Sequence, residues 1–198
     1  MGEVILQRRD VVAKLLQDRG TALVVSGLGS PTYDVAAVSP SARNYYLWGA
    51  MGGTVMVGMG LALAQTDQHI IVITGDGEAL MGMGSLATVG VRQPNNLSIV
   101  VIDNEHYGET GMQASHLAMG VDLCGIAQSC GIVDSRLVCD ETQLQEALSN
   151  FHSTGAPKFV QVKVSADTPV RVMPTRDAVE NKLGFRAELG LSDGASGS

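Results

Sequence analysis

Short apolar runs alternate with amphipathic stretches along most of the chain. Two of the apolar runs, 69–74 and 97–102, are rich in β-branched residues, a pattern typical of central strands in a parallel sheet. Apolar residues at helical spacing, as in 6–19, predict helices around these runs. The alternation of strands and helices predicts an α/β fold: a doubly wound, mostly parallel sheet with helices on both faces.

The same pattern predicts where most elements lie. Strands are expected at 22–25, 45–48, 69–74, 97–102, 132–138 and 159–164. Helices are expected at 6–19, 33–38, 51–65, 78–91, 122–128 and 142–152, with a short one from about 176. The segment 105–120 has several glycines and little periodicity, so we expect a functional loop there.

The predicted helix at 51–65 is apolar nearly all round. A helix without a polar face is expected to be buried, and its glycines and alanines allow neighbouring backbones to approach closely. The stretch is too short to span a membrane and ends in the polar residues 65–68. We therefore expect a buried helix of a globular domain.

Composition narrows the classes of protein. Of 198 residues, 45% are hydrophobic and 17% charged, which suits one globular domain and excludes a disordered chain. No apolar run reaches the roughly 18 residues of a membrane span. A formal charge of −7 argues against nonspecific nucleic-acid binding. Three cysteines without a CxxC pattern, and an N-terminus unlike a secretory signal, favour the cytoplasm.

Glycine is unusually frequent, with 24 in the chain. Four glycine-bearing segments follow the predicted strands: 26–30, 49–53, 75–78 and 103–111. Ligands of open parallel sheets bind beyond the carboxyl ends of the strands, where such loops converge. Glycine also lets main-chain N–H groups approach a phosphate. The pattern therefore indicates a phosphate-bearing ligand.

The triplet Gly75-Asp76-Gly77 is the most informative of these segments. Leu80 stands where a dinucleotide fingerprint needs its third glycine, and no Gly-Lys-Ser/Thr triplet follows for a phosphate loop. A carboxylate between the two glycines would repel a diphosphate unless a cation stood between them. Asp76 therefore indicates a divalent metal that bridges the protein and a diphosphate.

A hard cation needs further oxygen ligands. Asn104 ends the next central strand, 28 residues after Asp76, a spacing that accommodates one helix and a return strand. If the two strands are neighbours, both side chains meet at one point, and a main-chain carbonyl just past Asn104 can complete the set. Three protein oxygens, two diphosphate oxygens and a water would give Mg²⁺ its octahedral coordination.

This pattern resembles the diphosphate-binding domain of thiamine diphosphate (ThDP) enzymes. The family motif is GDG followed, about 25 to 30 residues later, by an Asn at a strand end, and here it covers residues 75–104. The resemblance extends over 22 to about 165. It implies a ThDP-binding domain at 1–168 and a C-terminal appendix at 169–198, whose last residues, 191–198, are expected to form a frayed tail.

The resemblance also implies roles for individual residues. Asp76, Asn104 and the main-chain carbonyl of His106 correspond to the metal ligands. Met51 corresponds to a wedge that bends the cofactor, and the Gly49 carbonyl to an acceptor for its aminopyrimidine; an ordinary core role for Met51 is the alternative. The cofactor contacts implied are Gly27, Gly29, Ser30, Gly49, Ala50, Met51, Gly75, Asp76, Gly77, Glu78, Ala79, Asn104, His106, Tyr107 and Gly108.

The loop at 103–113 fits the form DNxxYGxTGxQ. This form is similar to sulfopyruvate and phosphonopyruvate decarboxylases, and it also occurs in 2-oxoacid:ferredoxin oxidoreductase β subunits. The chain lacks the CxxC-type cysteines usual in the oxidoreductases. Thr110 stands where simple pyruvate decarboxylases have Glu, which argues against plain pyruvate. Met51, Glu109, Thr110 and His116 are the candidate catalytic residues, and His116 is alternatively an ordinary loop residue.

These features predict the β subunit of a ThDP- and Mg²⁺-dependent decarboxylase of a small anionic 2-oxoacid, such as sulfopyruvate or phosphonopyruvate. ThDP enzymes also need an activating Glu from a pyrimidine-binding domain, for which 198 residues leave no room. We therefore expect a partner α subunit and a hetero-oligomer. The alternatives are an oxidoreductase or carboligase subunit of the same family, or a noncatalytic nucleotide- or diphosphate-binding module.

Overall fold

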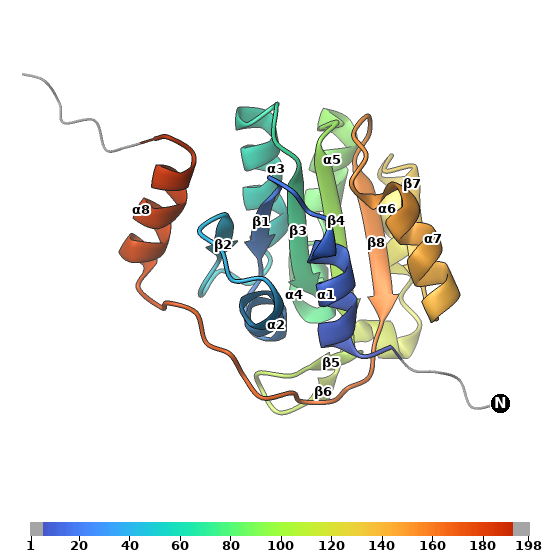
Figure 1. The fold of residues 1–198 in the computed structure, drawn as a ribbon. Helices are drawn as coiled ribbons and strands as arrows, with labels where there is room; N and C mark the ends of the chain where they lie inside the picture. The colour runs from blue at the N-terminus through green and yellow to red at the C-terminus, as the bar shows by residue number, and fades with distance from the viewer. Residues whose placement is uncertain (1–5, 192–198) are drawn as a thin grey trace, which may run out of the picture.

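A single six-stranded sheet forms the centre of the computed structural model, which describes residues 6–191. All neighbouring strands are parallel, and their order is β2-β1-β3-β4-β8-β7. The predicted doubly wound α/β fold is confirmed (Figure 1). The strands are β1 (Leu23–Ser26), β2 (Asn44–Tyr46), β3 (Ile70–Gly75), β4 (Leu97–Asp103), β7 (Asp134–Val138) and β8 (Lys158–Lys163).

Helices cover both faces of the sheet because successive strand residues point to opposite sides. On one face, Ile71 and Ile73 of β3 pack in the cluster formed with α1 (Arg8–Gln17), α2 (Ser30–Val38) and α7 (Glu141–Phe151). On the other, Ile70 and Val72 pack with α3 (Thr54–Ala64), α5 (Ser85–Arg92) and α6 (Leu123–Ser129). Every residue of β4 is buried, as expected for a central parallel strand.

The register of β3 and β4 brings their carboxyl ends together. Thr74 pairs with Val101 and Gly75 with Ile102, so the two strands end side by side. Asp76 begins α4 (Asp76–Met81) one residue beyond β3, and Asn104 follows β4 directly. The predicted neighbouring of these two strand ends is confirmed.

The helix expected at 78–91 is interrupted. It consists of α4 and α5, separated by a turn around Gly82 and Gly84. A Cβ on Gly82 would overlap the carbonyl of Gly52, so the chain turns where two backbones touch. The strand predicted at 45–48 is also displaced, because β2 ends at Tyr46.

The expected burial of the helix at 51–65 is only half correct. The helix, α3, begins at Thr54, and Gly58 lies so close to β3 that a Cβ would overlap Val72. On its other side Met56, Val57 and Leu63 are exposed. The sheet covers one side of α3, and nothing else in residues 6–191 covers the opposite one, so its apolar face is open in this chain.

The segment 105–120 contains short regular elements rather than a plain loop. Strands β5 (His106–Tyr107) and β6 (Gln113–Ala114) form an antiparallel pair, followed by a 3-10 helix at His116–Met119. This hairpin lies beyond the carboxyl ends of β3 and β4 (Figure 1).

After β8, which lies next to the edge strand β7, residues 164–177 run as an extended strap to the opposite edge of the sheet at β2 (Figure 1). There α8 (Ala178–Glu188) packs against β2: Asn181 Nδ2 donates to the Tyr46 carbonyl at 2.9 Å, and Phe185 lies against Tyr45. The helix expected from about 176 is therefore present. The predicted tail 191–198 lies, apart from Leu191, outside the described residues.

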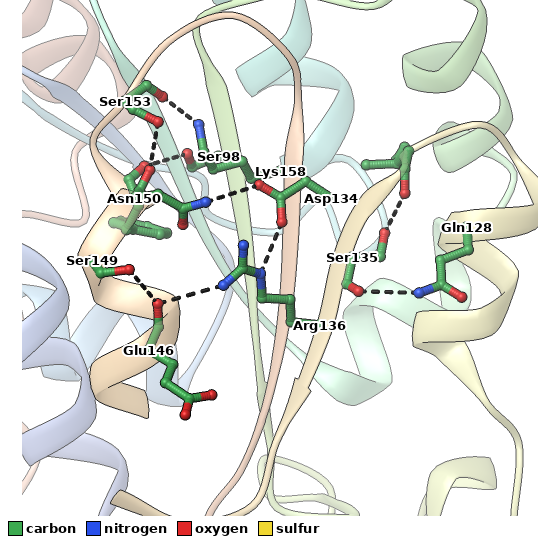
Figure 2. Close-up of polar contacts among 12 residues, drawn as sticks. Ser98, Gln128, Asp134, Ser135, Arg136, Glu146, Ser149, Asn150, Ser153 and Lys158 are labelled. Atoms are coloured by element: carbon green, nitrogen blue, oxygen red, sulfur yellow. Dashed lines mark hydrogen bonds and ion pairs between the residues drawn. The ribbon is translucent and has the colours of Figure 1, made fainter. Parts of the chain in front are cut away.

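The amino ends of β7 and β8 are closed by polar contacts (Figure 2). Lys158, which is almost fully buried, donates to the Ser153 carbonyl, and burial lowers the pKa of Lys158. Asp134 accepts from Arg136 at 2.9 Å and from Asn150 at 3.4 Å. These contacts satisfy polar groups at the edge of the sheet opposite the glycine-rich loops.

His69, just before β3, couples the stability of the fold to pH. Its Nε2 lies 3.0 Å from Ser98 Oγ, and burial, with smaller effects of His152 and Lys158, lowers its pKa to about 4. The folded state thus favours neutral imidazole. The stabilisation is present above the unfolded pKa near 6.5 and is lost as the pH falls from there towards 4.

The unfolding free energy of the wild type should therefore fall between pH 7.5 and pH 4.5. In His69→Gln we expect this fall to be smaller by about 1–2 kcal/mol. Urea titrations at both pH values measure this difference. The exposed His116 provides a control, because His116→Gln should follow the wild type. Equal pH dependence of all three proteins would contradict the assignment.

Candidate active site

A cavity of about 210 Å³ lies at the carboxyl edge of the sheet. It is lined by the turn after β3, the turn after β4, the start of α2 and the segment before α3. Twelve of the predicted site residues line it: Ser30, Met51, Gly75, Asp76, Gly77, Glu78, Asn104, His106, Tyr107, Gly108, Glu109 and Thr110. The other predicted site residues, all in the described part of the chain, do not: Gly27, Gly29, Gly49, Ala50, Ala79 and His116.

Asp76 is a buried acidic residue in the wall of this cavity. It is 3% exposed, and its Oδ2 is buried without a hydrogen-bond partner. Burial raises the pKa of Asp76 to about 6, and Asp103 contributes in the same direction, while the Ser115 hydroxyl and the Gly77 amide lower it. An unpaired buried carboxylate oxygen is costly. Its position in a cavity wall fits a group that binds a cation.

The groups around Asp76 that could bind a metal suit Mg²⁺ better than a metal that requires several His, Cys, Asp or Glu side chains. No group of three or more His, Cys, Asp or Glu side chains is gathered as a metal site within residues 6–191. Of the three carboxylates that line the cavity, Glu78 is bound by Thr54 and Thr74 and Glu109 lies on the outer wall, so the turn itself offers the Asp76 carboxylate, the Asn104 amide and main-chain carbonyls. Mg²⁺ is commonly held by one or two carboxylates together with phosphate oxygens and water.

The turn that carries Asn104 is held rigidly. The Asn104 Oδ1 accepts from the His106 amide at 3.1 Å, and the Asn104 carbonyl lies 2.7 Å from His106 Nδ1. Beneath the turn, the buried Asp103 contacts Lys163 at 2.9 Å and Gln161 at 2.7 Å. The His106 ring therefore braces the turn, which leaves the main-chain carbonyl as its candidate ligand atom.

The side chain of Glu78 has a structural role at the site. Its carboxylate is 4% exposed and accepts from Thr54 Oγ1 and, at 2.9 Å, from Thr74 Oγ1. Thr54 is the first residue of α3 and Thr74 lies in β3, so Glu78 connects the segment before α3 to the turn after β3. Gly27 packs against this carboxylate, which a Cβ at that position would overlap.

Two other glycines permit close contacts at the site. A Cβ on Gly77 would overlap the Tyr107 ring, so only glycine leaves room for Tyr107 beside the turn. Gly29 has φ +81° and lies against Glu109. Side chains at either position would displace a cavity-lining residue.

The segment 48–53 bends through two residues with positive φ, Gly49 at +73° and Gly52 at +88°. The bend places Met51 in the cavity wall with 38% of its surface exposed. The alternative that Met51 is an ordinary core residue is therefore wrong. Trp48 anchors the segment, since its Nε1 donates to the Thr175 carbonyl at 2.9 Å.

Two arginines at the site have no signal in the sequence: Arg8 lines the cavity, and Arg171 lines a small pocket beside it. Arg8 is 3% exposed and contacts Asp34 at 3.1 Å, and it also donates to Ser30. The Arg171 guanidinium lies 5.3 Å from the centre of the Tyr33 ring. In the sequence, Arg8 and Arg171 resemble ordinary solvated surface residues. Only the folded chain brings them to the carboxyl ends of the strands.

The predicted catalytic residues are not all together. Glu109 and Thr110 line the cavity, and Thr110 Oγ1 donates to Gln113 Oε1 at 2.8 Å. His116 is exposed in the 3-10 helix and lies outside the cavity lining. A role for His116 in the reaction stays a prediction.

The sequence matches the family model of the thiamine pyrophosphate enzyme, C-terminal TPP binding domain, over residues 27–162. The chain belongs to this family. None of the helices in residues 6–191 is long and apolar enough to cross a membrane.

Among its relatives are sulfopyruvate decarboxylase β subunits. The chain is 40% identical to that of Methanocaldococcus jannaschii over 127 residues, which are 64% of this chain and 67% of that protein. It is 32% identical to that of Methanothermobacter thermautotrophicus over 180 residues, 89% of this chain and 94% of that protein. The phosphonopyruvate decarboxylase of Streptomyces viridochromogenes is 35% identical over 154 residues, 78% of this chain and 38% of that protein.

A solved structure shares the fold. A Mycobacterium smegmatis protein described as a thiamin diphosphate-dependent enzyme superposes with a TM-score of 0.71 at 20% identity. The match covers 83% of this chain and 32% of that protein.

The contacts of Glu78 predict a stability effect. Glu78→Ala would leave the buried Thr54 and Thr74 hydroxyls without their acceptor, and we expect a loss of about 1–3 kcal/mol of unfolding free energy. Urea unfolding at pH 7.5 measures it. Glu146→Ala, on the exposed side of α7, should change stability by less than about 0.5 kcal/mol. A Glu78→Ala protein as stable as the Glu146→Ala control would refute the role.

Proposed function

We propose that this chain is the diphosphate-binding β subunit of a ThDP- and Mg²⁺-dependent 2-oxoacid decarboxylase. The observation that carries the proposal is the buried Asp76 carboxylate, with one unpaired oxygen in the cavity and Asn104 on the adjacent strand end. The β-subunit relatives support the reaction. We take the substrate to be a small 2-oxoacid with a second acid group, as in sulfopyruvate and phosphonopyruvate.

Asp76, Asn104 and the His106 carbonyl would hold the Mg²⁺. The amides at the start of α4, from Gly77 to Ala79, would receive the diphosphate, because free N–H groups at a helix start favour anions. The remaining predicted contacts are Gly27, Gly29, Ser30, Gly49, Ala50, Gly75, Tyr107 and Gly108. Gly27 and Gly29 contribute by leaving room for Glu78 and Glu109.

Bound ThDP supplies the electron sink that allows CO₂ to leave a 2-oxoacid. The chain's own residues orient the reactants. Met51 projects into the cavity where the cofactor rings would lie, and the Gly49 carbonyl would accept from the aminopyrimidine. Glu109 and Thr110 are placed on the cavity wall, where a carboxyl or hydroxyl group can exchange a proton with the substrate carbon.

A partner subunit would complete the site. A cavity of about 210 Å³ is smaller than the roughly 300–1,000 Å³ typical of pockets that enclose a whole small-molecule ligand. The open apolar face of α3, with Met81 and Met83 also exposed, supplies a surface that another chain can cover. We propose that a pyrimidine-binding α subunit binds there and contributes the activating Glu. We also propose that this hetero-oligomer is cytoplasmic.

Residues 1–168 would form the cofactor-binding domain, and the segment from 169 the appendix. The appendix is short for an independent domain, and α8 packs on β2 through Asn181 and Phe185. We therefore assign it a supporting role at the edge of the same domain.

Replacement of Asp76 tests the proposal. Asp76→Asn should weaken binding of ThDP in the presence of Mg²⁺ by at least about 100-fold, measured by calorimetry on the full chain. The unfolding temperature of the cofactor-free variant should not fall, because the change removes a buried unpaired charge. Asp67→Asn, in the exposed turn before β3, should bind like the wild type.

Full ThDP affinity in Asp76→Asn would refute the metal assignment. Tighter binding of a nucleotide than of ThDP would instead favour the noncatalytic module. For the complex with its partner, release of the aldehyde and CO₂ from sulfopyruvate identifies a decarboxylase. Reduction of an electron acceptor without free aldehyde identifies an oxidoreductase subunit.

A further inference from the structure

The strap at 164–177 passes along the carboxyl edge of the sheet, below α2 and beside the β5–β6 hairpin (Figure 1). Among the hydrogen bonds that hold it there, two lie on either side of Arg171. Arg9 Nη2 donates to the Val170 carbonyl at 2.8 Å, and Trp48 Nε1 donates to the Thr175 carbonyl at 2.9 Å. The residues between these two anchors, including Arg171, are therefore kept at the rim of the active-site cavity.

Beneath the strap, a side pocket continues the main cavity. Arg8, Ser30, Asn104, Gly108 and Glu109 line both. The strap itself contributes Asp167, Thr168 and Arg171 to the side pocket, and α2 contributes Tyr33. The side pocket holds only about 20 Å³, so a ligand in the main cavity can extend no more than one small group into it.

The charged groups of the side pocket differ in how firmly they are paired. Arg8 is buried against Asp34 at 3.1 Å. The Asp167 carboxylate accepts from Ser165 Oγ at 2.6 Å. Arg171 lies 3.5 Å from Glu109, at the outer limit of a hydrogen bond, and its side chain is half exposed. Glu109 is therefore an exchangeable counter-ion for Arg171.

Tyr33 prepares Arg171 to receive an anion. The guanidinium carbon lies over the Tyr33 ring, 5.3 Å from its centre, and this cation–π contact restrains the position of Arg171. Burial and the nearby Glu109 raise the pKa of Tyr33, so its hydroxyl remains protonated and can donate a hydrogen bond. A guanidinium edge beside a hydroxyl donor suits an oxyanion with several acceptor oxygens.

We propose that Arg171, oriented by Tyr33, binds the second acid group of the substrate and so selects sulfonate- or phosphonate-bearing 2-oxoacids over pyruvate. On binding, this acid group replaces Glu109 as the counter-ion of Arg171. The choice of substrate class rests on the proposed function, whereas the anion subsite rests on the strap geometry. Glu109, once released, is free on the cavity wall beside Thr110.

Binding of unreactive analogues tests the subsite directly. The complex of this chain with its partner subunit, loaded with ThDP and Mg²⁺, is titrated calorimetrically with 3-sulfopropanoate, 3-phosphonopropanoate and, as the single-acid reference, propanoate. We expect at least one of the two analogues to bind the wild type about tenfold tighter than propanoate. The better of the two identifies the acid group.

Three variants make the test specific. Arg171→Gln should reduce the preference over propanoate to about twofold or less. Glu109→Gln should strengthen binding of the preferred analogue, because the competing carboxylate is gone. Arg92→Gln, an exposed arginine at the end of α5 on the opposite edge of the sheet, should bind like the wild type. An Arg171→Gln protein with an unchanged preference, or a wild type without one, overturns the proposal.

Turnover by the complex with the partner subunit separates this inference from the proposed function. Arg171→Gln should lower kcat/KM for the dianionic 2-oxoacid about 10- to 100-fold, mainly through KM, and change that for pyruvate less than about threefold. Selective analogue binding without any decarboxylation would sink the proposed function alone. Decarboxylation with equal loss for both substrates would sink the anion subsite alone.

Discussion

The site is organised around one buried charge without a partner. Asp76 lies where β3 ends beside β4, and its Oδ2 has no hydrogen-bond donor. Such a group is tolerated only where something else compensates it. The neighbouring buried Asp103 has Lys163 as its counter-ion and accepts a hydrogen bond from Gln161. This contrast is the reason why we propose Asp76, and not Asp103, as the metal ligand.

Close backbone approach assembles the rest of the site around Asp76. Gly77 makes room for the Tyr107 ring, Gly27 for the Glu78 carboxylate, and Gly82 for the backbone of Gly52. Each of these pairs joins segments that are distant in sequence. The frequent glycines therefore reflect contacts between loops as well as space for a phosphate group.

One side of the cavity is covered by the chain itself, and the other side is exposed. The strap and α8 cover the side near α2 and β2, and they bring Arg171 to the rim. On the other side, the exposed Met51, Met81 and α3 face leave apolar surface next to the cavity. This asymmetry fits the proposal that a partner subunit covers the open side of the cavity.

Local patterns in the sequence determined the succession of strands and helices along the chain. They also determined the position of the Gly-Asp-Gly turn and of the strand end that carries Asn104. These follow from residue type and short spacing, because hydrophobic period and turn chemistry act over a few residues. Tertiary structure alone decided that α3 is open on one face, that the helix at 78–91 breaks at Gly82, and that Arg8 and Arg171 reach the site. Those outcomes depend on which segments meet in the folded chain, 14 residues apart for Gly58 and Val72 and 138 apart for Tyr33 and Arg171, and no local period encodes such a meeting.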